Sequence, residues 1–360
     1  MRRLPALLLA LLICLPLGGL AEKQKELTTV RMTLVGDCIL GSDEPLHSEK
    51  DSFVGMIRAM GNDYAYPFKY AREFFEQDDY TLINLECVLT DKKSYKNGSL
   101  YTNFYGPADF VNILTQNSVE GVSLSNNHAM DFGQGGLQDC QKNLTEAGVQ
   151  WAYNTDSFTF ERNGVRFAVL SFRRYYMEKY YQWLEKEIPR MKAEDGVDFV
   201  IVCLHHGEEY QDKHNDKDQT RFAHHAIDSG ADLVVGTHPH VLQGIEVYKN
   251  RLIFYSLGNF VFGGNKSPQS DKKTAKQIPT ALMSVELQFD QNQLYSTRLT
   301  IHPYYETGDE QINNYQPVPV TGDKAQRVMD ILQSDTPFTL NPFIEGEGAV
   351  QDIIYANDQH

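Results

Sequence analysis

The sequence predicts an α/β fold from three observations. Short β-type runs alternate with amphipathic stretches of helical length over the first two thirds of the chain. Farther along, consecutive β-type runs are joined by polar turns that contain Asn or Asp, which is typical of hairpins. Five of the β-type runs end in side chains that bind metals or donate hydrogen bonds. Because the carboxyl ends of strands line the ligand crevice in open α/β sheets, the same pattern predicts where the site lies.

The elements follow one another in a regular order. The predicted strands of the alternating part are Thr29–Gly36, Tyr80–Glu86, Glu120–Ser125, Gly164–Ser171, Val197–Leu204 and Ala231–Val235. The predicted helices are Tyr66–Gln77, Gly133–Ala147, Tyr175–Glu194 and Asp218–Ser229. The strand that starts at Gly164 follows an Asn-Gly hairpin signal. Two predicted hairpins come next, Gly244–Lys249 with Arg251–Tyr255 and Ala281–Phe289 with Gln293–Ile301.

Two segments, Gly41–Asn62 and Gly263–Ile278, have the composition of loops. Both follow motif residues, so each is either a wall of the site or a surface insertion. The last segment, Glu306–His360, is expected to be polar coil with one helix at Lys324–Gln333. We expect one domain over residues 27–305, with residues 306–360 as an extension packed on it.

The first 21 residues have the pattern of a secretory signal: two arginines, an apolar run over Leu7–Leu17 and small residues before Ala21. We expect cleavage after Ala21, and the main alternative is an uncleaved membrane anchor. A lipoprotein acylated at Cys14 is disfavoured because Ile13 stands where a small residue is needed. No other stretch approaches the roughly 18 apolar residues that cross a bilayer, so the rest is expected outside the cytoplasm.

The charge balance disfavours nucleic acid as a partner. The chain has 33 Lys and Arg against 48 Asp and Glu, for a formal net charge of −15 at pH 7. Loss of the two signal arginines lowers the first count from 33 to 31 and the net charge to −17. Such a surface repels polyanions. If the ligand is an anionic polymer, a metal centre is one way to make its binding cleft locally cationic.

Four cysteines remain after the signal, at Cys38, Cys87, Cys140 and Cys203. Their number is even and the expected compartment permits disulfides, but the sequence does not rank the three possible pairings. Cys38 and Cys87 each follow a candidate site carboxylate. Buried thiols are the favoured interpretation.

The strand-end motifs are Gly36-Asp37, Asn84-Leu85-Glu86, Ser125-Asn126-Asn127-His128, His205-His206-Gly207 and Gly236-Thr237-His238-Pro239-His240. Taken singly, most have an ordinary structural explanation: Asp37 as a turn or helix-cap residue, Glu86 as a solvated strand end. His238 and His240 give a stronger signal, because alternate residues of an extended segment face the same side.

Taken together, the motifs indicate a metal site. The candidate ligands are Asp37, Glu86, Asn127, His205, His238 and His240. Two carboxylates, one amide and three imidazoles suit one or two divalent transition ions, Mn, Fe or Zn, better than Ca or Mg. Six ligands exceed what one tetrahedral zinc takes, which favours two ions that clamp a phosphoryl oxygen. His128, next to the amide ligand, is placed as a proton donor to a leaving group.

The motifs resemble the CapA family of poly-γ-glutamate capsule-synthesis proteins. The resemblance runs from Thr29 to about Phe262 and includes Leu40-Gly41, Asp131, Gly133, Glu209-Tyr210 and Tyr255-Ser256-Leu257-Gly258-Asn259-Phe260. That family looks like a branch of the calcineurin-type metallophosphoesterases, which implies a four-layer sandwich of two mixed sheets flanked by helices. The resemblance implies metal-ligand positions for the six candidates and a general acid at His128. The residues implied to contact substrate are Asn126, Asp131, His206, Glu209, Tyr210 and Asn259.

Three positions depart from the patterns of relatives. The first motif of the wider superfamily is Asp-x-His, and here Ile39 occupies the place of the histidine. Glu86 stands for an aspartate that normally bridges the metals, so one metal position is expected to be weakened or empty. His206 sits where relatives of the CapA type usually carry Trp, and it is assigned only to the cleft wall.

The expected function is that of an exported metal-dependent hydrolase in capsule or cell-surface polymer assembly. The superfamily implies a phosphoester bond, whereas poly-γ-glutamate implies an amide-linked polymer, and the sequence leaves both open. The alternative is a non-catalytic assembly or export subunit that binds an anionic polymer: Ile39 favours it, and His128 favours catalysis. A third interpretation is a surface module that binds glycans or peptides. The expected partners are an anionic cell-surface polymer or its precursor and membrane capsule-synthase subunits.

Overall fold

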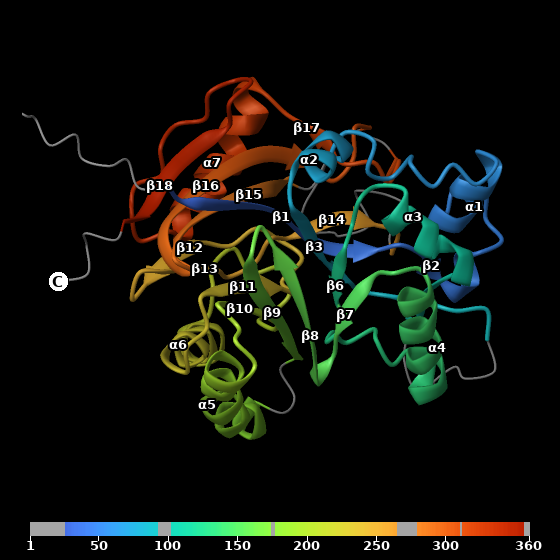
Figure 1. Ribbon diagram of the computed structural model, residues 1–360. Helices are drawn as coiled ribbons and strands as arrows, with labels where there is room; N and C mark the ends of the chain where they lie inside the picture. The colour runs from blue at the N-terminus through green and yellow to red at the C-terminus, as the bar shows by residue number, and fades with distance from the viewer. Residues whose placement is uncertain (1–25, 93–101, 174–176, 265–278, 310–311, 356–360) are drawn as a thin grey trace, which may run out of the picture.

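The computed structural model describes residues 26–92, 102–173, 177–264, 279–309 and 312–355. The expected secretory signal and most of the expected loop at 263–278 lie outside the described residues. Within the described part, two large mixed sheets face one another and helices cover their outer faces (Figure 1).

In the described ranges the larger sheet has nine strands. They are β1 (Thr28–Ile39), β3 (Tyr80–Leu85), β6 (Gly121–Ser123), β7 (Gln150–Ala152), β14 (Asn259–Phe262), β15 (Pro279–Asp290), β16 (Gln293–Tyr305), β17 (Val318–Pro319) and β18 (Ala349–Tyr355). The main order is β17-β16-β15-β1-β3-β6-β7, while β14 pairs with β1 and β18 with β16. Strands β1, β3, β6 and β7 run parallel, whereas β15 is antiparallel to both β1 and β16.

The smaller sheet has the order β12-β13-β11-β10-β9-β8. Its strands are β8 (Asn154–Arg162), β9 (Val165–Arg173), β10 (Phe199–His205), β11 (Leu233–Thr237), β12 (Ile245–Tyr248) and β13 (Arg251–Phe254). The central strands are parallel and an antiparallel hairpin closes each edge. A third, minor sheet joins β2 (Ser42–Asp43), β5 (Phe104–Gly106) and β4 (Val88–Leu89).

The helices form the two outer layers. Those on the larger sheet are α1 (Phe53–Ala59), α2 (Arg72–Gln77), α3 (Val111–Thr115) and α4 (Gly133–Glu146), and those on the smaller sheet are α5 (Met177–Glu194) and α6 (Arg221–Asp228). Short helical turns lie at Glu44–Leu46, Ala108–Phe110 and Asp216–Thr220. Helix α7 (Gly322–Asp335) packs beside β15 and β16 (Figure 1).

Strand β10 shows why the layers form. Its sequence FVIVCLH is apolar at successive positions, which suits a strand buried on both faces. Phe199, Ile201 and Cys203 face the core between the sheets, and Val200, Val202 and Leu204 face the core under α5 and α6. Alternate residues of one strand therefore serve two different layers. The expected four-layer arrangement of two mixed sheets flanked by helices is confirmed.

Some local expectations are wrong. The expected loop at Gly41–Asn62 contains α1, whose N-cap Ser52 accepts the backbone N–H of Gly55 at 3.0 Å. A helix of seven residues is too short to establish a helical period in sequence. The expected helix Tyr66–Gln77 is helical only from Arg72. No strand was expected at β14, and β8 was implied only as the hairpin partner before Asn163.

The coil expected after residue 306 is also wrong for β17 and β18. Strand β18 pairs antiparallel with β16, with Ala349 opposite Ile301. Its partner lies about fifty residues earlier in the chain, so no local pattern encodes the pairing. The C-terminal segment thus adds a strand to the larger sheet.

The four cysteines at 38, 87, 140 and 203 are all free and buried, which confirms the interpretation as buried thiols. Among the helices that the structure describes, none combines the length and apolar character needed to cross a bilayer.

Candidate metal centre

The motif residues meet where strands of both sheets end. Asp37 lies near the end of β1, Glu86 directly follows β3, and His205 is the last residue of β10. The pairing of β1 with β3 sets Asp37 beside Asn84, and the pairing of β10 with β11 sets His205 beside Thr237. Parallel pairing therefore brings these strand ends to one region, as the sequence predicts.

One group of candidate ligands consists of Asp37, Glu86 and His240, whose ligand atoms lie within 4.8 Å of one another. Nδ1 of His240 is 3.2 Å from Oδ2 of Asp37, and its Nε2 is 3.9 Å from Oε1 of Glu86. All three side chains are buried. Nδ1 of His240 also lies 2.9 Å from Oδ1 of Asn259, so this imidazole is held from two sides.

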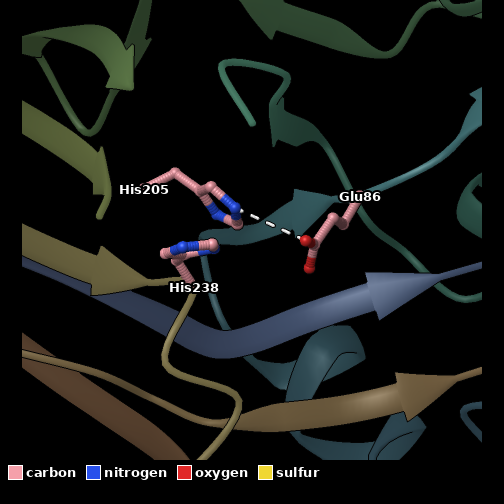
Figure 2. Close-up of side chains that lie close together, drawn as sticks. All are labelled: Glu86, His205 and His238. Atoms are coloured by element: carbon pink, nitrogen blue, oxygen red, sulfur yellow. Dashed lines mark ion pairs between the residues drawn. The ribbon is translucent and has the colours of Figure 1, made fainter. Parts of the chain in front are cut away.

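A second group consists of Glu86, His205 and His238, with ligand atoms within the same 4.8 Å limit. In Figure 2 the two imidazoles lie close together and the Glu86 carboxylate points toward His205. Nε2 of His205 is 3.4 Å from Oε1 of Glu86 and 2.6 Å from Oδ1 of Asn127. The amide of Asn127 thus joins this group, and Glu86 belongs to both groups.

Burial governs the charges of the cluster. Burial and the neighbouring Asp37 raise the pKa of Glu86, and neither carboxylate oxygen of Glu86 has a hydrogen-bond partner among the described residues. Burial alone would raise the pKa of Asp37, but the hydrogen bond and charge of His240 lower it. Burial would lower the pKa of His240, but the charges of Glu86 and Asp37 raise it. Before an ion binds, Asp37 and His240 therefore form a buried ion pair, and His240 must lose its proton to act as a ligand.

The other two histidines are neutral. Burial lowers the pKa of His205 to about 3 and that of His238 to about 2. Nδ1 of His238 has no hydrogen-bond partner among the described residues. Neutral imidazoles and partnerless buried carboxylate oxygens are the donors that a divalent transition ion takes. The residues present fit such an ion.

The backbone that carries His238 and His240 is not extended. Their φ angles are +100° and +59°, a region that non-glycine residues seldom occupy. The backbone N–H of His238 donates to Oδ2 of Asp37 at 3.2 Å, which ties this turn to β1. The two rings lie in one cluster because the chain turns between them. The expected proximity of His238 and His240 is therefore present, but the extended backbone from which it was predicted is not.

Asn84 is a site residue that the sequence analysis quoted only as part of a motif. Its Nδ2 donates to Oδ1 of Asp37 at 2.7 Å and lies 3.2 Å from Nδ1 of His205. Oγ1 of Thr237 lies 3.0 Å from the same nitrogen of His205. The sequence signal that could have identified Asn84 is its position two residues before Glu86 at the end of the same strand.

His128 is held by Asp131. Its Nδ1 is 2.8 Å from Oδ2 of Asp131, and the same carboxylate oxygen accepts the backbone N–H of Phe104 at 2.7 Å. The rings of Phe104 and His128 lie 4.4 Å apart. His128 belongs to neither group described above, and Asp131, expected to contact substrate, is placed to orient this ring.

The remaining candidates for substrate contact differ in exposure. Asn126 is fully buried and donates to the carbonyl of Leu85 at 2.8 Å, while Asn259 is buried against His240. The ring of His206 lies 6.1 Å from that of Phe222 in α6, so it faces the outer layer. Glu209 is exposed and Tyr210 half-buried, on the loop after β10.

Comparison with known proteins gives a family match and similar relatives. A family model described as "Bacterial capsule synthesis protein PGA_cap" matches residues 31–264. The chain is 31% identical over 264 residues to the capsule biosynthesis protein CapA of Bacillus anthracis, which covers 67% of this chain and 61% of the relative. It is 33% identical over 214 residues to the PGA biosynthesis protein CapA of Bacillus subtilis, which covers 54% of this chain and 56% of the relative. The matches thus span about three fifths of the length of these relatives.

Among solved structures, a phosphatase of Mycoplasma pneumoniae is similar with a TM-score of 0.46 and 10% identity, covering 85% of this chain and 100% of the phosphatase. The family model, by contrast, matches well over half of the 360 residues and includes every motif of the cluster. This chain therefore belongs to the family of bacterial capsule synthesis proteins of the PGA_cap type.

Proposed function

We propose that this chain is a metal-dependent hydrolase that acts on a phosphoester or related bond during assembly of an anionic capsule polymer of the poly-γ-glutamate type. The observation that carries the proposal is the buried carboxylate of Glu86, which has no hydrogen-bond partner among the described residues and lies 3.4 Å from a neutral histidine, His205. Ionisation of a carboxyl group buried in this way costs several kcal/mol unless a cation compensates the charge. The arrangement therefore supports a divalent ion at this place.

Two ion positions follow from the two groups. Asp37, Glu86 and His240 would hold one ion, and Glu86, Asn127, His205 and His238 the other, with Glu86 shared. When bound, such ions polarise a phosphoryl oxygen and lower the pKa of a bound water toward neutrality. The ions are Mn, Fe or Zn by the donor set.

The chain itself supplies the proton donor. The hydrogen bond that Nδ1 of His128 donates to Asp131 fixes the ring of His128, and the ring of Phe104 packs against it. A histidine held by a carboxylate through Nδ1 leaves Nε2 to carry the proton that a leaving group needs. His128 would thus act on the substrate, while Asn127 in the same loop would hold an ion.

Family membership supports a role in capsule synthesis, since the relatives are described as capsule or PGA biosynthesis proteins. The expected secretory signal supports a location outside the cytoplasm, where an anionic polymer and membrane subunits of a capsule synthase would be the partners. An acidic protein that binds an anionic chain needs a local positive charge, and bound cations would provide it.

A second candidate is a non-catalytic subunit that binds the polymer for assembly or export. Ile39, two residues after Asp37, favours this candidate because its side chain is fully buried among apolar residues and offers no ligand atom. A weaker ion at that position would still attract an anion without supporting turnover.

The test is hydrolysis of a nitrophenyl phosphodiester by the Mn²⁺-loaded protein. We expect turnover by the wild type and a loss of roughly 10²–10⁴-fold in His128→Ala, as is usual for a general acid. The matched control is His224→Ala on α6. Nε2 of His224 lies 3.0 Å from Oε2 of Glu246, so this change also removes a histidine–carboxylate pair, and it should leave the rate unchanged. The opposite result would be a metal-loaded wild type that hydrolyses nothing, with equal binding of γ-glutamyl polymer by the wild type and His128→Ala. That result would reject the hydrolase and support the assembly subunit.

A further inference from the structure

Glu209 lies on the loop that follows β10, and the backbone fixes this loop at two points. Gly207 has a φ of +126°, and a Cβ there would come within 2.9–3.0 Å of the side chain of Gln219. The backbone N–H of Tyr210 donates to the carbonyl of Pro239 at 2.8 Å, in the turn between His238 and His240. Glu209 is therefore held next to the histidine turn.

The carboxylate of Glu209 is close to both histidines. Ligand atoms of Glu209, His238 and His240 lie within 4.8 Å of one another. His240 also belongs to the group with Asp37 and Glu86. Unlike those two buried carboxylates, Glu209 is exposed, so it lies on the solvent side of the cluster.

The ion position at Asp37 has three protein ligands and is open to a fourth, either a side chain or a solvent molecule. Asp37, Glu86 and His240 offer three groups, whereas transition ions in proteins take at least four. Ile39 points into the core and supplies none. Besides Asp37 and Glu86, the described residues include one more carboxylate, that of Glu209, with an oxygen within 4.8 Å of a ring nitrogen of His240 in a possible ligand group.

The charges agree with this view. Three carboxylates, those of Asp37, Glu86 and Glu209, have an oxygen within 4.8 Å of a ring nitrogen of His240. A divalent cation would balance the excess negative charge.

We propose that Glu209 is a metal ligand on the solvent side of the cluster, where it would bind together with His240 of the Asp37 position and with His238 of the neighbouring position. This role differs from a contact to substrate. The inference rests on the metal centre of the proposed function and not on hydrolysis.

The experiment is a calorimetric titration of metal-free protein with Mn²⁺, with the wild type, Glu209→Gln and the matched control Glu208→Gln. Glu208 is the neighbouring exposed glutamate, but it lines a separate open cavity of about 700 Å³ with His214 and Gln219. We expect Glu209→Gln to lose one ion or to bind it at least about tenfold more weakly, because even partners outside the ligand set contribute roughly 10–100-fold to metal affinity. Glu208→Gln should bind as the wild type does.

The melting temperature of the metal-free protein should be the same in all three forms, because both side chains are exposed. Unchanged Mn²⁺ binding in Glu209→Gln, or equal losses in both variants, would overturn the inference. Uptake of no ion by the wild type would overturn it together with the metal centre. In a further outcome, the wild type binds two ions but hydrolyses nothing, and Mn²⁺ binding is weakened only in Glu209→Gln. This outcome would support the inference and reject only the hydrolase.

Discussion

Oε1 of Glu86 and Nε2 of His205 lie 3.4 Å apart, although the two residues come from different sheets. Glu86 follows β3 of the larger sheet, and His205 ends β10 of the smaller one. Both side chains are buried, and the imidazole is neutral. The contact joins the two sheets at the candidate metal centre, and the neutral ring of His205 contributes no charge to balance the carboxylate.

We predict that divalent ions stabilise the folded protein through Glu86. Mn²⁺ or Zn²⁺ at a hundred times its dissociation constant should raise the free energy of unfolding by about 2.7 kcal/mol. Glu86→Gln should abolish this increase and should stabilise the metal-free protein, because it removes a buried carboxylate without a hydrogen-bond partner among the described residues.

Thermal unfolding with and without the ion measures both effects. The control is Glu286→Gln, which removes a glutamate paired with Arg31 at the surface and should respond to the ion as the wild type does. Equal stabilisation of the wild type and Glu86→Gln by the ion would show that the ion binds elsewhere.

Two neighbouring residues should fail in different ways. Oδ1 of Asn127 lies 2.6 Å from His205, whereas His128 is bound to Asp131. Asn127→Ala should therefore lose metal and activity together, while His128→Ala should keep its metal and lose turnover. Elemental analysis beside the phosphodiester assay separates the two outcomes, and equal metal loss in both variants would remove the distinction between ligand and acid.

Stability should fall with rising pH because of Glu306. This side chain is buried, burial raises its pKa to about 8, and it accepts hydrogen bonds from Asn259 and Asn313. Its pKa in the unfolded chain is about 4.3, so the folded state binds the proton more tightly. Its contribution to stability is greatest below pH about 4.3, declines as the pH rises to about 8, and is then constant.

Glu306→Gln stays uncharged and should lack this decline. In urea unfolding with a chelator present, we expect the stability of the variant relative to the wild type to be greater at pH 9 than at pH 5. Each unit of pKa shift corresponds to about 1.4 kcal/mol. A stability difference between variant and wild type that does not change with pH would contradict the assignment.

The sequence predicted those features that depend on local pattern. Apolar strands such as Phe199–His205 and the polar residues at their ends gave the α/β class and the place of the site. It did not predict the features that depend on distant partners: β18 forms only because β16 lies beside it, and Asn84 gains its role from contacts with Asp37 and His205. The turn at His238 was also not predicted, because nothing in a His-Pro-His segment demands positive φ angles.

The metal content of purified Glu22–His360 tests the central claim most directly. After reconstitution with Mn²⁺ or Zn²⁺ and removal of excess ion, elemental analysis should find between one and two ions per chain. His238→Ala should lose most of this metal while it keeps its fold, because His238 is only partly buried and few apolar contacts are lost. Less than about a tenth of an ion per chain in the wild type would contradict the account, since the cluster of Asp37, Glu86, His205, His238 and His240 would then be a buried polar network with no metal function.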